Sequence, residues 1–104
     1  MGRRTDPKIV DFLKKVRKRY KIEKAIFFGS RARGDNLKTS DYDLILVSRD
    51  FEGVFFSQRS ADMYEFWDYY PLDIELFCYT PQEFEVMLKR IGTVQQAAKE
   101  GIVL

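Results

Sequence analysis

Apolar residues recur near the start of the chain at the three- and four-residue spacing of one helix face. They are Ile9, Phe12, Leu13, Val16 and Tyr20. The pair Asp6-Pro7 is typical of a helix start, because aspartate caps the first turn and proline fits the first helical position. The pattern predicts a helix over residues 7–20 with one buried face.

Three later segments are rich in apolar residues of the kinds that favour strands. They span residues 23–30, 42–48 and 72–79. The first ends at Gly29-Ser30, which is typical of a turn. The third runs into Thr80-Pro81-Gln82-Glu83, where Thr80 and Glu83 form a capping box that predicts a helix from residue 81 to about residue 90.

The remaining segments complete an alternating order of helices and strands. We expect helices over residues 57–68 and 93–100, and a short edge strand over residues 102–104. This order predicts an α/β or α+β fold in which helices cover one side of a small mixed sheet.

The length and composition of the chain predict a single folded domain that spans residues 1–104. The 104 residues are 45% hydrophobic and 33% charged, which suits a globular chain. The single cysteine, Cys78, excludes an internal disulfide. The chain lacks an apolar stretch of membrane-spanning length, and its first residues lack the apolar core of a signal peptide. We therefore expect a cytoplasmic protein without a membrane anchor.

The net charge is +2, but basic and acidic residues are unevenly distributed along the chain. Residues 1–24 contain ten Lys and Arg against three acidic residues, whereas the rest of the chain contains eight against thirteen. A basic segment attracts polyanions such as RNA or a nucleotide, although a lysine-rich helix face more often only contacts solvent. Binding to nucleic acid is therefore one open hypothesis.

Two aspartates begin the second expected strand, although the residues that follow are apolar. Asp41 and Asp43 share one face because side chains alternate along a strand. Asp73 and Glu75 share one face of the third expected strand. If the two strands pair, Asp73 lies beside the first two aspartates. Three such carboxylates repel one another unless a divalent cation binds them.

Oxygen ligands favour Mg²⁺ or Mn²⁺, and the absence of His argues against zinc. Two ions about 3.5 to 4 Å apart, bridged by Asp41 and Asp43, would stabilise the attacking and leaving oxygens of a displacement at phosphorus. Asp73 would complete one ion and accept a proton from the attacking hydroxyl.

The turn before the aspartates could hold the phosphates of a nucleoside triphosphate. Gly29 lets the backbone approach a phosphate, and Ser30 offers a hydroxyl and an N–H group. Of Arg31 and Arg33, alternation brings one to the site, and we favour Arg33. Each feature alone is common in turns and strand ends. These features occur together with Asp73, a third acidic residue that strand alternation can place on the same face as the first two aspartates. The combination favours a binding site.

These residues together resemble the signature of the DNA polymerase β-like nucleotidyltransferases. The matching residues are Gly29-Ser30, Gly34, Ser40-Asp41-Tyr42-Asp43-Leu44 and Leu72-Asp73-Ile74. The resemblance implies a mixed sheet with helices on one face, two Mg²⁺ ions and a nucleoside triphosphate as substrate. It also implies triphosphate binding by Gly29 and Ser30, and metal binding and catalysis by Asp41, Asp43 and Asp73. We add Arg33 and Ser40 to the expected nucleotide-binding residues.

The short length is similar to that of the minimal nucleotidyltransferases of prokaryotes, often encoded beside a HEPN-domain protein in toxin–antitoxin pairs. This resemblance implies transfer of AMP from ATP to a hydroxyl of the HEPN partner, which would silence the toxin.

Two other hypotheses stay open. The chain could be a binding module that neutralises a partner by covering it, because segment 51–70 holds more aromatic residues than one small helix can bury. That surplus would suit a partner or a second copy of the chain. The chain could also be an RNA-binding accessory protein that acts through its basic first helix.

Overall fold

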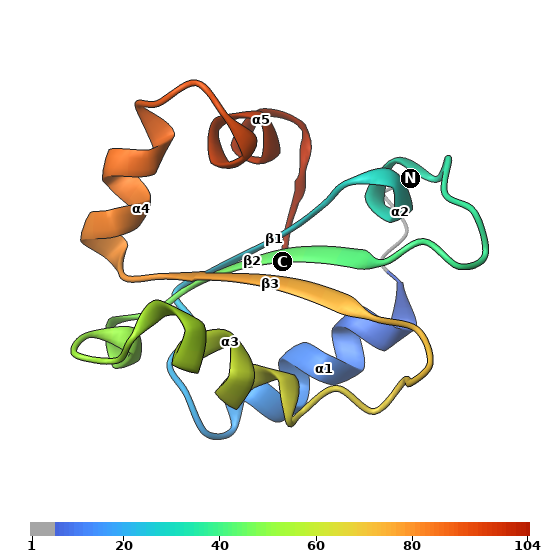
Figure 1. Cartoon of the computed structure of the whole chain (residues 1–104), viewed down its shortest axis with the longest axis horizontal. Coiled ribbons are helices and arrows are strands. Elements are labelled where there is room, and N and C mark those ends of the chain that lie inside the picture. The colour runs from blue at the N-terminus through green and yellow to red at the C-terminus, as the bar shows by residue number, and fades with distance from the viewer. Residues whose placement is uncertain (1–5) are drawn as a thin grey trace.

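The computed structural model describes residues 6–104 and contains a four-stranded sheet between two layers of helices (Figure 1). Residues 1–5, which include two arginines of the expected basic segment, lie outside the described residues. The elements are α1 (Pro7–Arg17), β1 (Lys24–Phe28), α2 (Ser30–Arg33), β2 (Tyr42–Val47), the 3₁₀ turn η1 (Arg49–Phe51), α3 (Phe56–Tyr64), β3 (Ile74–Tyr79), α4 (Pro81–Leu88), α5 (Thr93–Glu100) and β4 (Ile102–Val103).

The strands lie in the order β3-β2-β1-β4. β2 is parallel to β3, whereas β1 is antiparallel to both β2 and β4. This mixed sheet confirms the predicted α+β class. The register pairs Asp43 with Phe28 at the end of β1 and with Glu75 near the start of β3. The first residues of β2 therefore lie where β1 ends and β3 begins.

Helices α1 and α3 cover one face of the sheet. Phe12 and Val16 of α1 and Met63 of α3 pack with Tyr42 and Leu44 of β2, and all five are fully buried. Each such apolar side chain contributes roughly 1.5–3 kcal/mol relative to an exposed position. The spacing of apolar residues in the first helix predicted the buried face of α1.

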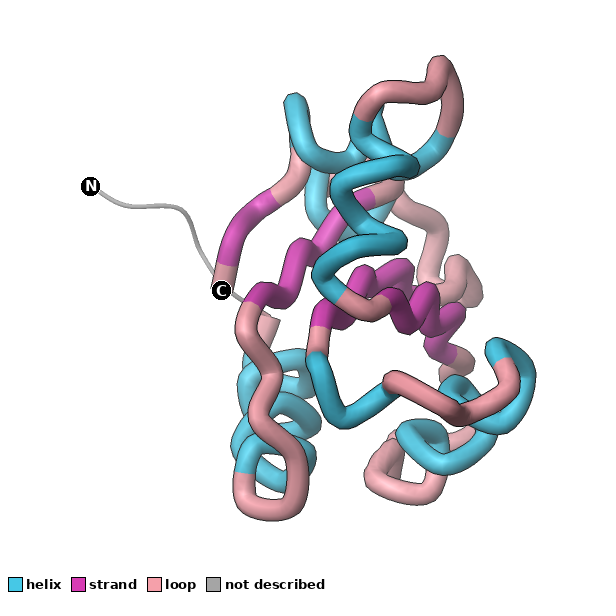
Figure 2. The backbone as a smooth tube through the Cα atoms, turned by 90° about the vertical axis from the view of Figure 1, so that its left-hand side faces the viewer, coloured by secondary structure: helices cyan, strands magenta, loops and turns pink. Residues whose placement is uncertain are grey.

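The opposite face is covered by α4 and α5, whereas the sequence led us to expect helices on one side only (Figure 2). Ile26, Ile45 and Val47 point to this face and pack with Phe84 of α4 and Val94 of α5. Apolar residues lie on both sides of β1 and β2, so both sides need a cover. The result is a three-layer arrangement.

The aromatic segment divides between the core and the surface. Trp67 is buried and its Nε1–H donates to the carbonyl of Leu72 at 2.7 Å. Phe55 and Tyr70 keep 86% and 85% of their surface exposed.

Within residues 6–104, the helices are too short or too polar for any of them to cross a membrane.

Candidate functional site

The end of β1 meets the start of β2 at Gly29. This residue has a φ of 83°, in the left-handed region that favours glycine. A Cβ atom at Gly29 would overlap Oδ2 of Asp43 and lie 3.1 Å from its carboxyl carbon. Glycine is thus required here for two independent reasons, and the turn lies directly against the Asp43 carboxyl group.

Ser30 begins α2, which is a single helical turn. The N–H of Arg33 donates to the Gly29 carbonyl at 3.1 Å, and the N–H of Gly34 donates to the Ser30 carbonyl at 2.9 Å. The backbone N–H groups of residues 30–32 precede these bonds and have no acceptor inside the helix. N–H groups in this position can bind a phosphate.

The carboxyl group of Asp43 lies against that of Glu75, its neighbour in the β2–β3 register. The pKa of Asp43 is raised to about 6, first by burial and then by the hydrogen bond between the two carboxyl groups. The charges of Glu75 and Asp41 raise it further, whereas Arg33 opposes the rise. Negative charge at Asp43 is therefore only partly compensated by the protein.

Asp73 has a different environment. Its carboxylate accepts a hydrogen bond from the Tyr64 hydroxyl at 2.7 Å, and its backbone carbonyl accepts one from the Tyr42 N–H at 2.9 Å. Strands β2 and β3 do pair as expected, but the residue level with Asp43 is Glu75. Alternation along a strand gives Asp73 and Glu75 the same face, so the sequence could not choose between them.

The metal site expected from Asp41, Asp43 and Asp73 stays a prediction. Among residues 6–104, no three Asp, Glu, Cys or His side chains lie close enough together to hold a metal ion. Asp43 nevertheless interacts electrostatically with both Asp41 and Glu75. They offer only carboxylate oxygens, and this donor chemistry and the excess negative charge fit Mg²⁺ or Mn²⁺.

The two arginines of α2 point to different surroundings. Arg31 donates from Nε to the Ser40 carbonyl at 2.8 Å and from Nη2 to the Lys38 carbonyl at 2.7 Å. Its guanidinium also lies 4.4 Å from the centre of the Tyr42 ring. Arg31 therefore holds the loop before β2, whereas Arg33 is exposed and lines a cavity.

Ser40, which the sequence places in the nucleotide site, forms hydrogen bonds within that same loop. Its hydroxyl accepts from the Leu37 N–H at 3.0 Å. Together with Arg31, this bond fixes the chain that leads to Asp41. A contact between Ser40 and a nucleotide stays a prediction.

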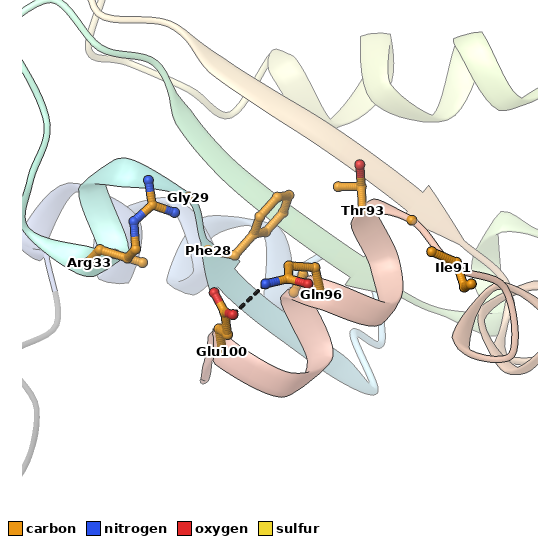
Figure 3. A pocket seen from close by; sticks show the side chains of 10 residues that line it. Phe28, Gly29, Arg33, Ile91, Thr93, Gln96 and Glu100 are labelled. Carbon is orange, nitrogen blue, oxygen red and sulfur yellow. Dashed lines mark hydrogen bonds between the residues drawn. The ribbon is translucent and has the colours of Figure 1, made fainter.

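The cavity has a volume of about 460 Å³ and lies between the end of β1, α2 and α5 (Figure 3). Gly29 lines the cavity and also lies against the carboxyl group of Asp43. The cavity is therefore next to the Asp43 carboxyl group. Its size is in the range of small-molecule sites. The sequence did not predict this cavity: a helix was expected over residues 93–100, but how α5 packs against β1 depends on tertiary contacts.

Comparisons with known proteins give a consistent result. A family model described as a nucleotidyltransferase domain matches residues 9–100. The crystal structure of a proposed nucleotidyltransferase from Sulfolobus solfataricus shares 25% sequence identity with a TM-score of 0.57, over 72% of this chain and 66% of that one. The present chain thus spans just under two thirds of that protein. A comparison with curated proteins gave no match.

Proposed function

The chain belongs to the nucleotidyltransferase domain family, and from this membership we propose that it transfers AMP from ATP to a hydroxyl acceptor and releases pyrophosphate. The observation that carries the proposal is the contact between Gly29 and Asp43. This contact brings the backbone N–H groups of residues 30–32, at the start of α2, next to a group of carboxylates. The N–H groups can bind a phosphate, and the carboxylates can bind the metal ion that accompanies it.

Each residue of the site has a distinct role in this proposal. Asp41, Asp43 and Glu75 would hold the divalent cation, because Glu75 is level with Asp43 in the β2–β3 register. Asp73, whose backbone carbonyl accepts from the Tyr42 N–H, stays the alternative third ligand. The bound ion would neutralise charge on the triphosphate and in the transition state. The hydroxyl and N–H of Ser30 bind phosphate oxygens, with Arg33 beside them.

The reaction is a displacement at phosphorus. The acceptor oxygen forms a bond to the α-phosphorus while the bond from that atom to the bridging oxygen of the β-phosphate breaks. Pyrophosphate leaves, and the acceptor proton passes to a carboxylate of the site or to water. Positioning of the reacting groups and charge neutralisation supply most of the acceleration in reactions of this class.

A HEPN-domain protein is the acceptor that we propose, following the resemblance to the minimal nucleotidyltransferases. Exposed aromatic residues such as Phe55 and Tyr70 support a protein partner, because large apolar side chains at a surface favour association. The same residues would suit the alternative function of a non-catalytic module that covers its partner. Only the enzyme would need ATP for neutralisation.

Transfer of radiolabel from α-labelled ATP to the product of the neighbouring gene tests the proposed reaction. We expect labelling by the parent chain and at least a hundredfold slower labelling by Asp41→Asn and Asp43→Asn, because both lose a charged ligand. Asp62→Asn is the matched control, since Asp62 lies on α3 and its carboxylate accepts a hydrogen bond from Gln58, another α3 residue. Equal labelling by the parent and the Asp41 and Asp43 variants would refute the proposal.

The assignment of the third carboxylate has its own pair of variants. Mg²⁺-dependent binding of ATP should weaken about tenfold or more in Glu75→Gln, because an anionic ligand is lost. It should persist in Asp73→Asn, in which the Tyr64 hydroxyl can donate to the amide oxygen instead. The opposite result would restore Asp73 to the role that the sequence suggested.

A further inference from the structure

The cavity beside Gly29 is lined by polar side chains from α5 and by Arg33 from α2 (Figure 3). Nε2 of Gln96 donates a hydrogen bond to the Glu100 carboxylate. A carboxylate can only accept, so the amide NH₂ of Gln96 must face Glu100 and Oε1 must point away from it. Gln96 and Glu100 therefore offer the cavity hydrogen-bond acceptors.

The other walls are mainly apolar. Phe28, Ala32 and Ile91 line the cavity from β1, α2 and the turn before α5. The Phe28 ring packs against Phe77 at 5.7 Å between ring centres, which fixes its position. Near α5, a flat, largely apolar ligand with a donor group fits such walls, whereas phosphate oxygens would be repelled by the Glu100 carboxylate. Arg33 lines the cavity from α2, where a phosphate is favoured instead.

We propose that this cavity binds the base of the nucleoside triphosphate and selects a purine that carries an exocyclic amino group, as adenine does. This inference rests on the proposed function. The amino group donates to Oε1 of Gln96 while the base packs against Phe28. Because Gly29 lies in the cavity wall and against Asp43, one nucleotide can extend from the carboxylates into the cavity.

Calorimetric titration with ATP and with inosine triphosphate, each with Mg²⁺, tests this selection. Inosine has a carbonyl where adenine has the amino group, so two acceptors would face each other at Gln96. The parent chain should bind ATP about tenfold more tightly than inosine triphosphate, the effect of one unmatched hydrogen bond. Gln96→Ala should lose that preference, because its acceptor is gone.

Two further variants separate recognition of the base from effects on the fold. Gln95→Ala removes the same amide one position earlier, where Nε2 donates to the Leu88 carbonyl outside the cavity. It should keep the preference for ATP. Thr93→Trp places a large side chain at the exposed cavity edge and should weaken binding of both nucleotides, while sodium tripolyphosphate, which has no base, binds as before.

The outcomes distinguish this inference from the function on which it rests. If Gln96→Ala and Thr93→Trp bind ATP as the parent does, the cavity is not the base site, although Mg²⁺-dependent binding of ATP by the parent would still support the proposed function. Equal affinity of the parent for ATP and inosine triphosphate would also overturn the inference. If the parent binds neither nucleotide, the proposed function fails and the inference fails with it.

Discussion

Replacement of Asp43 by asparagine should stabilise the metal-free protein at neutral pH. Most substitutions at a buried strand position destabilise, but here the native residue is a poorly compensated charge. Burial, Glu75 and Asp41 raise the pKa of Asp43 from 3.8 to about 6. Asparagine has nearly the same shape, carries no charge, and its amide can donate to the Glu75 carboxylate.

The size of the effect follows from the pKa. The difference between 3.8 and about 6 corresponds to at most about 3 kcal/mol, at 1.36 kcal/mol per pH unit. Asp43 is only partly buried, so solvent screening reduces the expected gain to about 1 kcal/mol. For a domain of this size, that gain raises the melting temperature by about 4 °C.

The effect has a definite pH dependence. Since the pKa of Asp43 is higher in the folded state, the folded protein favours the protonated carboxyl group. The stability that this group contributes is complete below about pH 4 and is lost as the pH rises through about 6. Asparagine does not titrate, so the variant and the parent should differ at about pH 8 and agree at about pH 4.

Thermal unfolding followed by circular dichroism in the presence of EDTA measures the difference at both pH values. Asp62→Asn, which changes a half-buried acid on α3, controls for a general effect of net charge. An Asp43→Asn variant that melts at or below the parent temperature at the higher pH would refute the electrostatic reasoning. So would a gain of equal size at both pH values, because the titrating group would then play no part.

Gly29→Ala should destabilise the fold by about 1–3 kcal/mol in urea unfolding, since alanine is strained at a φ of 83° and its Cβ collides with Asp43. Gly53→Ala has a similar φ of 78° with open space around it; equal losses in both would mean that the Asp43 contact is unimportant. Glu83→Ala leaves the buried Arg59 guanidinium without its ion pair and removes the Glu83 carboxylate from the capping box of α4. We expect a loss of about 3 kcal/mol by the same assay, and a loss below about 0.5 kcal/mol would contradict this.

Local sequence signals predicted much of the fold because they act over only a few residues. The capping box at Thr80 and Glu83 forms as expected, with the Thr80 N–H donating to the Glu83 carboxylate at 2.9 Å. Alternation along β2 correctly separated Asp43 from the core residues Tyr42 and Leu44, which face α1 and α3. These features depend on backbone geometry and on hydrogen bonds between near neighbours.

Features that depend on tertiary contacts were harder to predict. A shift of two residues between β2 and β3 leaves alternation unchanged, so the sequence could not decide whether Asp73 or Glu75 lies level with Asp43. The role of Arg31 depends on how the loop before β2 folds back over α2. The position of Gln96 at a cavity likewise depends on the packing of α5, which a helical periodicity does not specify.

The central claim is that the Gly29-Ser30 turn and the adjoining carboxylates bind a nucleoside triphosphate together with a divalent cation. Calorimetric titration with α,β-methylene-ATP, which cannot release pyrophosphate, tests this without an acceptor. We predict binding by the parent chain that requires Mg²⁺ or Mn²⁺ and disappears in Asp41→Asn and Asp43→Asn. Binding of equal strength in EDTA, or in both variants, would contradict the claim.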